Sequence, residues 1–144
     1  MSLDEPRSFR ARAPEIVERY LDASPDSFEW ERVRADFYYV RIRVPSLYLG
    51  WLPVELSLGH RTLKITAGFS VKPHANTADA YDYLLRLNLE APGLTFAIDP
   101  DNRIVLVGRV PLDELDDERL DAAFGRVVEI TESCVESYLS IGFR

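Results

Sequence analysis

The densest group of potential ligands or acid–base residues in this sequence is a run of carboxylates at residues 113–118. Carboxylates bind hard cations, but a calcium loop spaces its oxygens at alternate positions around a central glycine and ends in a bidentate Glu. Here Leu115 interrupts the run and the glycine is missing. We therefore interpret the run as negative charge at the start of a helix, where the helix dipole favours it. Its members are Asp113, Glu114, Asp116, Asp117 and Glu118.

A second polar group, Asp99, Asp101 and Asn102, resembles the opening of a calcium loop. Residues typical of a strand follow it at once, so residues 99–102 are better interpreted as a hairpin turn.

The usual nucleophiles and zinc ligands are few and dispersed. His60 and His74 fall in different predicted loops, and Cys134, the single cysteine, falls in the apolar stripe of a predicted helix. This spacing fits no zinc site, and a Cys–His pair would require Cys134 to leave its stripe. The sequence also contains no phosphate-binding glycine motif and no nucleophile elbow. It therefore predicts a protein that is not an enzyme, with no catalytic, metal or cofactor-binding residues.

Cationic and aromatic side chains are the better candidates for function. Arg41 and Arg43 lie in an outward row with Lys64 and Glu55, which indicates either cross-strand pairs of opposite charge or a site for an acidic peptide. A second group is aromatic: Tyr48 and Trp51 flank a predicted loop, and Trp30, Tyr38 and Tyr39 precede it. Aromatic residues of this kind either anchor a protein interface or fill the core, and the sequence leaves both possibilities open.

Composition restricts the class of protein. The 144 residues predict one domain, and the net charge of −7 disfavours binding to nucleic acid or to anionic membranes. No apolar run approaches the ~20 residues that span a bilayer, and no secretory signal is expected at the N-terminus. With one cysteine, an internal disulfide is impossible, which favours a reducing cytoplasm.

The elements that would position these residues follow from periodicity. We expect a flexible tail at residues 1–13 and a single α+β domain at residues 14–144, beginning with a helix at Pro14. Alternating residues predict three antiparallel strands at 37–44, 52–58 and 63–71, with a short extended segment near Phe28. A helix from Thr77 to Asn88 leads to two more strands, at 94–98 and 103–110. A final helix from about residue 117 to 141 has an apolar stripe wide enough to require more than one packing partner.

Several short motifs resemble those of the YbjN family. They are Tyr83–Asn88 (YLLRLN), Phe96–Asp99 (FAID), Val105–Leu112 (VLVGRVPL) and Leu139–Phe143 (LSIGF). The resemblance covers residues 51–143 and, before that, only the order of elements. It implies a fold like that of type III secretion chaperones, a helix, three strands, a helix, two strands and a helix, with an antiparallel sheet packed on the helices. It also implies a homodimer that binds a protein or peptide, and structural roles for Asn88 and Gly108.

Two hypotheses for function follow. The first is a non-enzymatic, homodimeric adaptor or chaperone-like protein with Arg41, Arg43, Tyr48 and Trp51 as candidate partner-binding residues. The second is a regulator that senses a small ligand bound between the sheet and the long helix. An unrecognised enzyme would instead require a deep pocket that holds a carboxylate with a strongly raised pKa.

The apolar run around Leu106 predicts a strand that is buried on both faces. We expect Leu106→Ala to lower the free energy of unfolding by about 2–5 kcal/mol, because it leaves a cavity in the core. Urea denaturation of the variant measures this loss. A loss below about 1 kcal/mol would show that the strand assignment is wrong.

Overall fold

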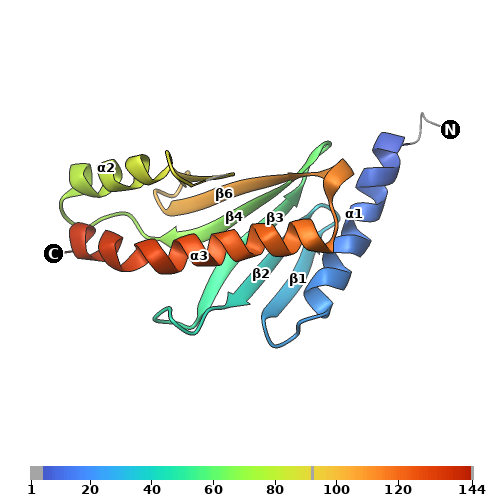
Figure 1. The fold of residues 1–144 in the computed structure, drawn as a ribbon, viewed down its shortest axis with the longest axis horizontal. Helices are drawn as coiled ribbons and strands as arrows, with labels where there is room; N and C mark the ends of the chain where they lie inside the picture. The colour runs from blue at the N-terminus through green and yellow to red at the C-terminus, as the bar shows by residue number, and fades with distance from the viewer. Residues whose placement is uncertain (1–4, 92, 144) are drawn as a thin grey trace.

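The computed structural model describes residues 5–91 and 93–143, with the side chains described from residue 9 onward. These described residues form three α-helices and six strands (Figure 1). In order they are α1 (Glu5–Asp22), β1 (Phe28–Arg34), β2 (Phe37–Arg43), β3 (Trp51–Leu58), β4 (Thr62–Ser70), α2 (Thr77–Leu87), β5 (Leu94–Ile98), β6 (Ile104–Pro111), the 3-10 turn η2 (Leu112–Glu114) and α3 (Asp117–Gly142).

All six strands form one antiparallel sheet in the order β1-β2-β3-β4-β6-β5. The predicted α+β class and the antiparallel sheet packed on helices are confirmed. The sheet has one strand more than the sequence predicted, because the extended segment near Phe28 is a full strand, β1. Phe28 is its one buried residue, so β1 lacks the alternation that marks a strand in sequence.

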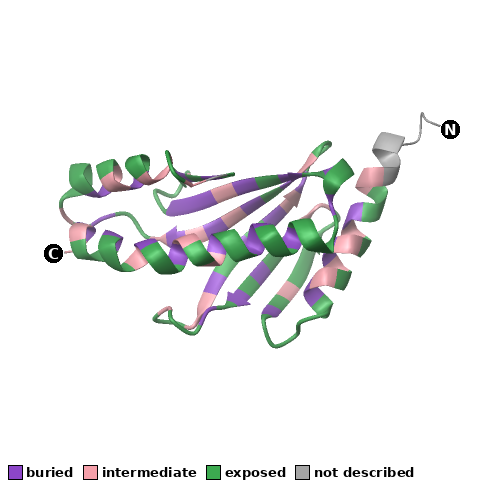
Figure 2. Ribbon diagram, viewed as in Figure 1, coloured by how far each residue is buried: buried purple, intermediate pink, exposed green. Residues whose placement is uncertain are grey.

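The long helix α3 runs across one face of this sheet (Figure 1) and packs on β4, β6, α1 and α2. It begins after Asp116, whose carboxylate Oδ1 accepts a hydrogen bond from the Arg119 backbone N–H at 2.8 Å. Buried residues recur along α3 and along the strands (Figure 2). The predicted apolar stripe of α3 is confirmed. It packs on several other elements, as the width of the stripe led us to expect. Its buried members are Leu120, Ala123, Phe124, Val127, Thr131, Cys134 and Tyr138.

The first helix begins earlier than the sequence predicted. α1 starts at Glu5, so residues 5–13 are helical where a tail was expected, while residues 1–4 lie outside the described part of the chain. Pro14 sits inside the helix, where it removes one backbone hydrogen bond. Ala13 and Val17 are fully buried on either side of this proline. Burial of this apolar face therefore outweighs the local signal for a helix start.

Asn88 joins the second helix to the fifth strand. It is the C-terminal cap of α2, and its backbone N–H donates to the Leu84 carbonyl oxygen at 3.2 Å. Its side chain makes two hydrogen bonds with the backbone of Phe96. Oδ1 accepts from the Phe96 N–H at 2.6 Å, and Nδ2 donates to the Phe96 carbonyl oxygen at 3.2 Å. One amide thus satisfies both backbone groups of a residue in edge strand β5.

Near the far end of α3, Tyr138 is fully buried and its hydroxyl donates to the Val71 carbonyl oxygen at 2.8 Å. Removal from water raises the pKa of Tyr138 to about 12. The neutral phenol is therefore the form that this contact holds.

Strand β6 lies between β4 and β5. Leu106 is fully buried, and Ile104 and Val105, which point to opposite faces, are also buried. Val107 is only half-buried, and within the described residues no helix packs on the face it shares with Val105. The strand is therefore buried on both faces at residues 104–106, as expected, but not at Val107. On the face that Val105 and Val107 share, neighbouring strands rather than a second layer provide the shielding.

Gly108 in β6 lies too close to β5 to carry a side chain. A Cβ there would meet Leu94 Cδ2 at 2.6 Å and the Gly93 carbonyl oxygen at 3.3 Å, and Leu94 is itself buried. We expect Gly108→Ala to lower the free energy of unfolding by about 1–3 kcal/mol through overpacking. The matched control is Gly125→Ala on the exposed side of α3, where a Cβ meets nothing within 4 Å. This control should raise stability by about 0.5–1 kcal/mol. Equal effects in thermal denaturation would contradict the crowding at Gly108.

Candidate functional site

The face of the sheet turned away from α3 carries the exposed residues of the alternating strands. In β2 these are Tyr39, Arg41 and Arg43, while their neighbours Val40 and Ile42 are buried against the helices. Within residues 5–91 and 93–143, none of the helices packs across this face. The strand period of two therefore presents the predicted arginines to solvent on an uncovered surface.

Arg41, Arg43 and Trp51 come together on this face. Arg43 pairs with Trp51 across β2 and β3, and both guanidinium carbons lie over the Trp51 ring, at 5.0 Å for Arg41 and 5.8 Å for Arg43. These distances are those of cation–π interactions. The indole thus holds two positive charges close to each other, and we call these three residues the arginine–tryptophan surface.

The charge pairs expected on this face form only in part. Arg41 makes an ion pair of 3.1 Å with Glu29, its cross-strand neighbour in β1. Arg43 has no carboxylate partner among the described residues. Lys64 does not lie opposite Glu55. Its neighbour in β6 is Arg109, and Glu55 lies opposite Thr66. The cations of this face slightly outnumber its carboxylates, Glu29, Glu31 and Glu55, although the chain as a whole carries a charge of −7.

The aromatic residues divide between core and surface. Tyr38 is fully buried, and its hydroxyl donates to Glu18 Oε2 at 2.7 Å. Tyr48, in the loop between β2 and β3, is fully exposed, and Leu49 beside it is 78% exposed. Both possibilities raised by the sequence are realised, at different positions. Tyr48 is thus available for contact but does not pack against Trp51.

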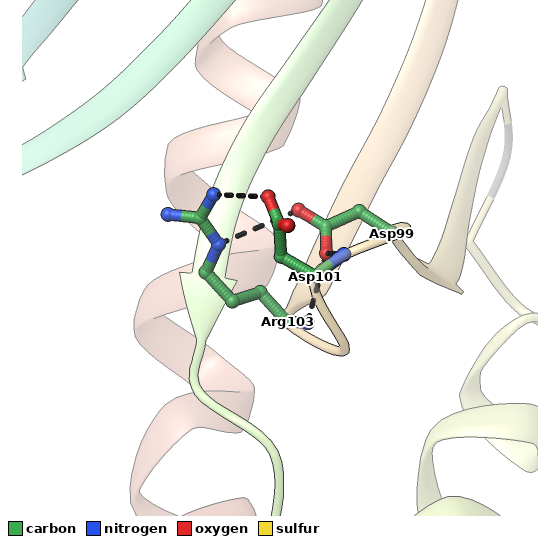
Figure 3. A network of polar contacts seen from close by, with 3 residues as sticks. All are labelled: Asp99, Asp101 and Arg103. Carbon is green, nitrogen blue, oxygen red and sulfur yellow. Dashed lines mark hydrogen bonds and ion pairs between the residues drawn. The ribbon is translucent and has the colours of Figure 1, made fainter.

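The two carboxylate groups serve local structure. In the hairpin between β5 and β6, Asp99 Oδ1 accepts from the backbone N–H groups of Asp101 and Arg103, both at 2.9 Å (Figure 3). The Arg103 guanidinium also pairs with Asp101 at 2.9 Å and Asp99 at 3.5 Å. Asn102 adopts the left-handed conformation, with φ of 64°, that closes the turn. In the second group, before α3, Glu114 pairs with Arg119 at 3.4 Å.

The residues considered as nucleophiles or ligands lie in separate places. Cys134 is buried in α3, the His74 ring packs 4.5 Å from that of Phe143, and His60 interacts with Arg10. In the part of the chain that is described, no three His, Cys, Asp or Glu residues are placed to hold a metal ion. The same residues include no helix long and apolar enough to cross a membrane.

The described residues also line two cavities, the smaller of which shares Arg43 with the arginine–tryptophan surface. The smaller, about 330 Å³, is walled by Tyr20, Phe28 and Phe124 and rimmed by carboxylates of α3. It lies between α3 and strands β1 and β2, where the second hypothesis placed a ligand. The larger, about 640 Å³, lies between α1 and the β3–β4 turn. Sequence reasoning missed the larger cavity because it treated the residues of α1 that line it as a tail.

Comparison with known structures identifies the fold. A structure from Methanothermobacter thermautotrophicus matches with a TM-score of 0.60 at 17% identity, covering 92% of this chain and 99% of its own. The structure of the Yersinia pestis type III secretion chaperone SycH with a fragment of YscM2 matches with a TM-score of 0.55 at 15% identity. This match covers 83% of this chain and 96% of the matched chain. A chain of the ExoU–SpcU complex of Pseudomonas aeruginosa matches with a TM-score of 0.54 at 15% identity. This match covers 83% of this chain and 95% of the matched chain. The fold is thus that of type III secretion chaperones, as predicted.

Sequence comparison identifies the family. Uncharacterized proteins of Mycobacterium tuberculosis and Mycobacterium leprae are 34% and 33% identical over 89 residues, or 62% of this chain. The chain covers 49% and 48% of those proteins, about half of their length. The profile of the YbjN family, described as "Putative bacterial sensory transduction regulator", matches residues 48–139. Because this match spans most of the chain and includes the β3-to-α3 core described above, the protein belongs to the YbjN family.

Proposed function

We propose that this protein is a non-enzymatic, chaperone-like or adaptor protein that acts as a cytoplasmic homodimer and binds an acidic segment of a polypeptide. The observation that carries this proposal is the arginine–tryptophan surface on the uncovered face of the sheet. Arginine and tryptophan are the residue types most enriched at the energetic centres of protein interfaces. Here Arg41 and Arg43 share one tryptophan ring, and among the described residues Glu29 is the one carboxylate that forms an ion pair with either of them.

The geometry favours a carboxylate-bearing partner. A guanidinium that lies over an aromatic ring keeps its N–H donors along its edge, and these can meet a carboxylate in bidentate fashion. Arg43 lacks an acidic partner among the described residues, so binding would not first have to break an ion pair. The Trp51 ring and the exposed loop residues Tyr48 and Leu49 supply apolar area nearby. An acidic segment with an apolar or aromatic residue fits this combination.

The structural neighbours support a polypeptide partner. SycH was solved with a fragment of YscM2, and the ExoU–SpcU structure is a heterodimer. Those partners belong to those proteins, and low identity conveys only the fold to this chain. Binding of a polypeptide is nevertheless a task that this fold is able to perform.

The second candidate is a regulator that senses a small ligand. The family description and the cavity of about 330 Å³ between α3 and strands β1 and β2 favour it. The rim of that cavity includes Arg43 together with Asp121, Glu129 and Glu132. Three carboxylates against one guanidinium would favour a cationic ligand, which separates this candidate from the first.

The first candidate is tested by capture of partners on the immobilised protein from lysate of its source organism. We expect a stoichiometric polypeptide that survives moderate salt and is lost with the double variant Arg43→Glu, Trp51→Ala. The variant Arg126→Glu is the control, because Arg126 is exposed on α3, away from this face. A polypeptide that both variants retain would contradict the assignment of the surface. Absence of any partner would favour the ligand-sensing candidate.

The homodimer is tested separately by sedimentation equilibrium. We expect a mass close to twice the 16.5 kDa of the chain at concentrations of about 1–10 μM, as for a stable interface with a Kd below that range. A monomer throughout this range would overturn the dimer while leaving the partner-binding surface untouched.

A further inference from the structure

The cavity of about 640 Å³ lies at the end of the sheet opposite α2. It is formed where the first half of α1 meets the β3–β4 turn and the segment that leaves β6. The Leu112 N–H donates to the Arg61 carbonyl oxygen at 2.8 Å and joins the last two of these segments. The walls of the cavity thus belong to elements of the fold. Its volume is in the range that small organic ligands occupy.

The polar lining of this cavity is cationic. Arg10 and Arg61 contribute two guanidiniums and Asp113 one carboxylate, which leaves one net positive charge when His60 is neutral. The side chain of Arg61 makes no hydrogen bond or ion pair within the described residues. A local excess of positive charge is notable in a chain whose net charge is −7. The lining therefore favours a ligand with a single negative charge.

The contact between Arg10 and His60 determines which ring nitrogen of His60 can donate a hydrogen bond. Arg10 Nη1 lies 3.2 Å from His60 Nδ1. A guanidinium can only donate, so Nδ1 accepts and the proton of the neutral imidazole is on Nε2. His60, which lines the cavity together with the two arginines, therefore carries its N–H group on Nε2. Three donors of this kind suit the two oxygens of a carboxylate.

The remaining lining is apolar. Phe9 of α1, Pro111 at the end of β6 and the buried Leu112 contribute carbon surface, and most of the exposed lining is apolar. A fully hydrated ion would leave this surface in contact with water. A ligand that carries an aliphatic or aromatic body behind its charged group would cover it and gain about 25 cal/mol per Å² of apolar area removed from water.

We propose that this cavity binds a small organic monoanion, a carboxylate with an apolar body. The site is distinct from the arginine–tryptophan surface and shares no residue with it, so it goes beyond the function proposed above. Because α1 forms one wall, an occupied cavity would also hold the first half of α1 against the β3–β4 turn. The same chemistry is offered by a free aliphatic acid and by the C-terminal carboxylate of a short apolar peptide.

The test uses decanoate and N-acetyl-leucyl-leucine as probes, each against its uncharged counterpart, decanol and the dipeptide amide. Calorimetric titration of the full chain should give saturable binding of at least one acid with a Kd below about 1 mM. The uncharged counterpart should bind at least about tenfold more weakly, because it lacks the charge-assisted hydrogen bonds. Backbone amide shifts at Thr62 and Leu112 should locate the bound acid. The acid that binds more tightly identifies the source of the carboxylate.

Variants separate this site from a general attraction for anions. Arg61→Gln should weaken binding of the acid roughly tenfold, since it removes one charged donor and breaks no hydrogen bond or ion pair among the described residues. The control Arg126→Gln removes an equal charge from exposed α3 and should leave the affinity unchanged, as should Arg43→Glu with Trp51→Ala. Equal binding of acid and uncharged counterpart, or no loss with Arg61→Gln, would overturn the proposal. So would the absence of saturable binding by either acid.

Discussion

The burial of one apolar stripe of α3 against the sheet is the interaction on which the other features depend. Leu120, Phe124 and Val127 pack beside Cys134 and Tyr138 along a single helix, which covers the middle of the six-stranded sheet while α1 packs on β1 and α2 on β5. Strands alternate with a period of two, and the side chains that do not face α3 are turned to the other side. The sheet is therefore apolar on one face and left open on the other. Of the candidate partner-binding residues, Arg41, Arg43 and Trp51 belong to that open face, and Tyr48 lies in the loop beside it.

Several polar side chains that the sequence singled out are engaged by backbone groups. Asp99 accepts two backbone N–H groups of its turn, Asp116 caps α3, and Asn88 holds both backbone groups of Phe96. A carboxylate that is engaged in this way is a structural acceptor. Arg43 and Arg61 differ, because neither has a carboxylate partner within the described residues. These two cations belong to the two surfaces for which we propose binding, one on the open sheet face and one beside α1.

The two surfaces are suited to different ligands. The arginine–tryptophan surface lies on the paired strands β2 and β3 with an exposed aromatic loop beside it, and we propose that it binds an extended polypeptide. The cavity beside α1 is concave and partly apolar, a shape that suits a small molecule. The two lie on different elements, so occupation of one requires no change in the other. Such an arrangement is compatible with a binding protein that also responds to a small ligand.

The sequence by itself determined those elements whose periodicity is long and regular. The stripe of α3, the alternation of β2 to β4 and the turn at Asp99 are local patterns, and the motifs from Tyr83 to Phe143 carry the family resemblance. Tertiary structure alone decided the rest. β1 is a strand because it pairs with β2, and α1 continues through Pro14 because Ala13 and Val17 are buried. The meeting of Arg10 with His60, fifty positions apart, depends on that docking and has no local signal. Contacts of this kind arise from packing between distant segments, which no period in the sequence records.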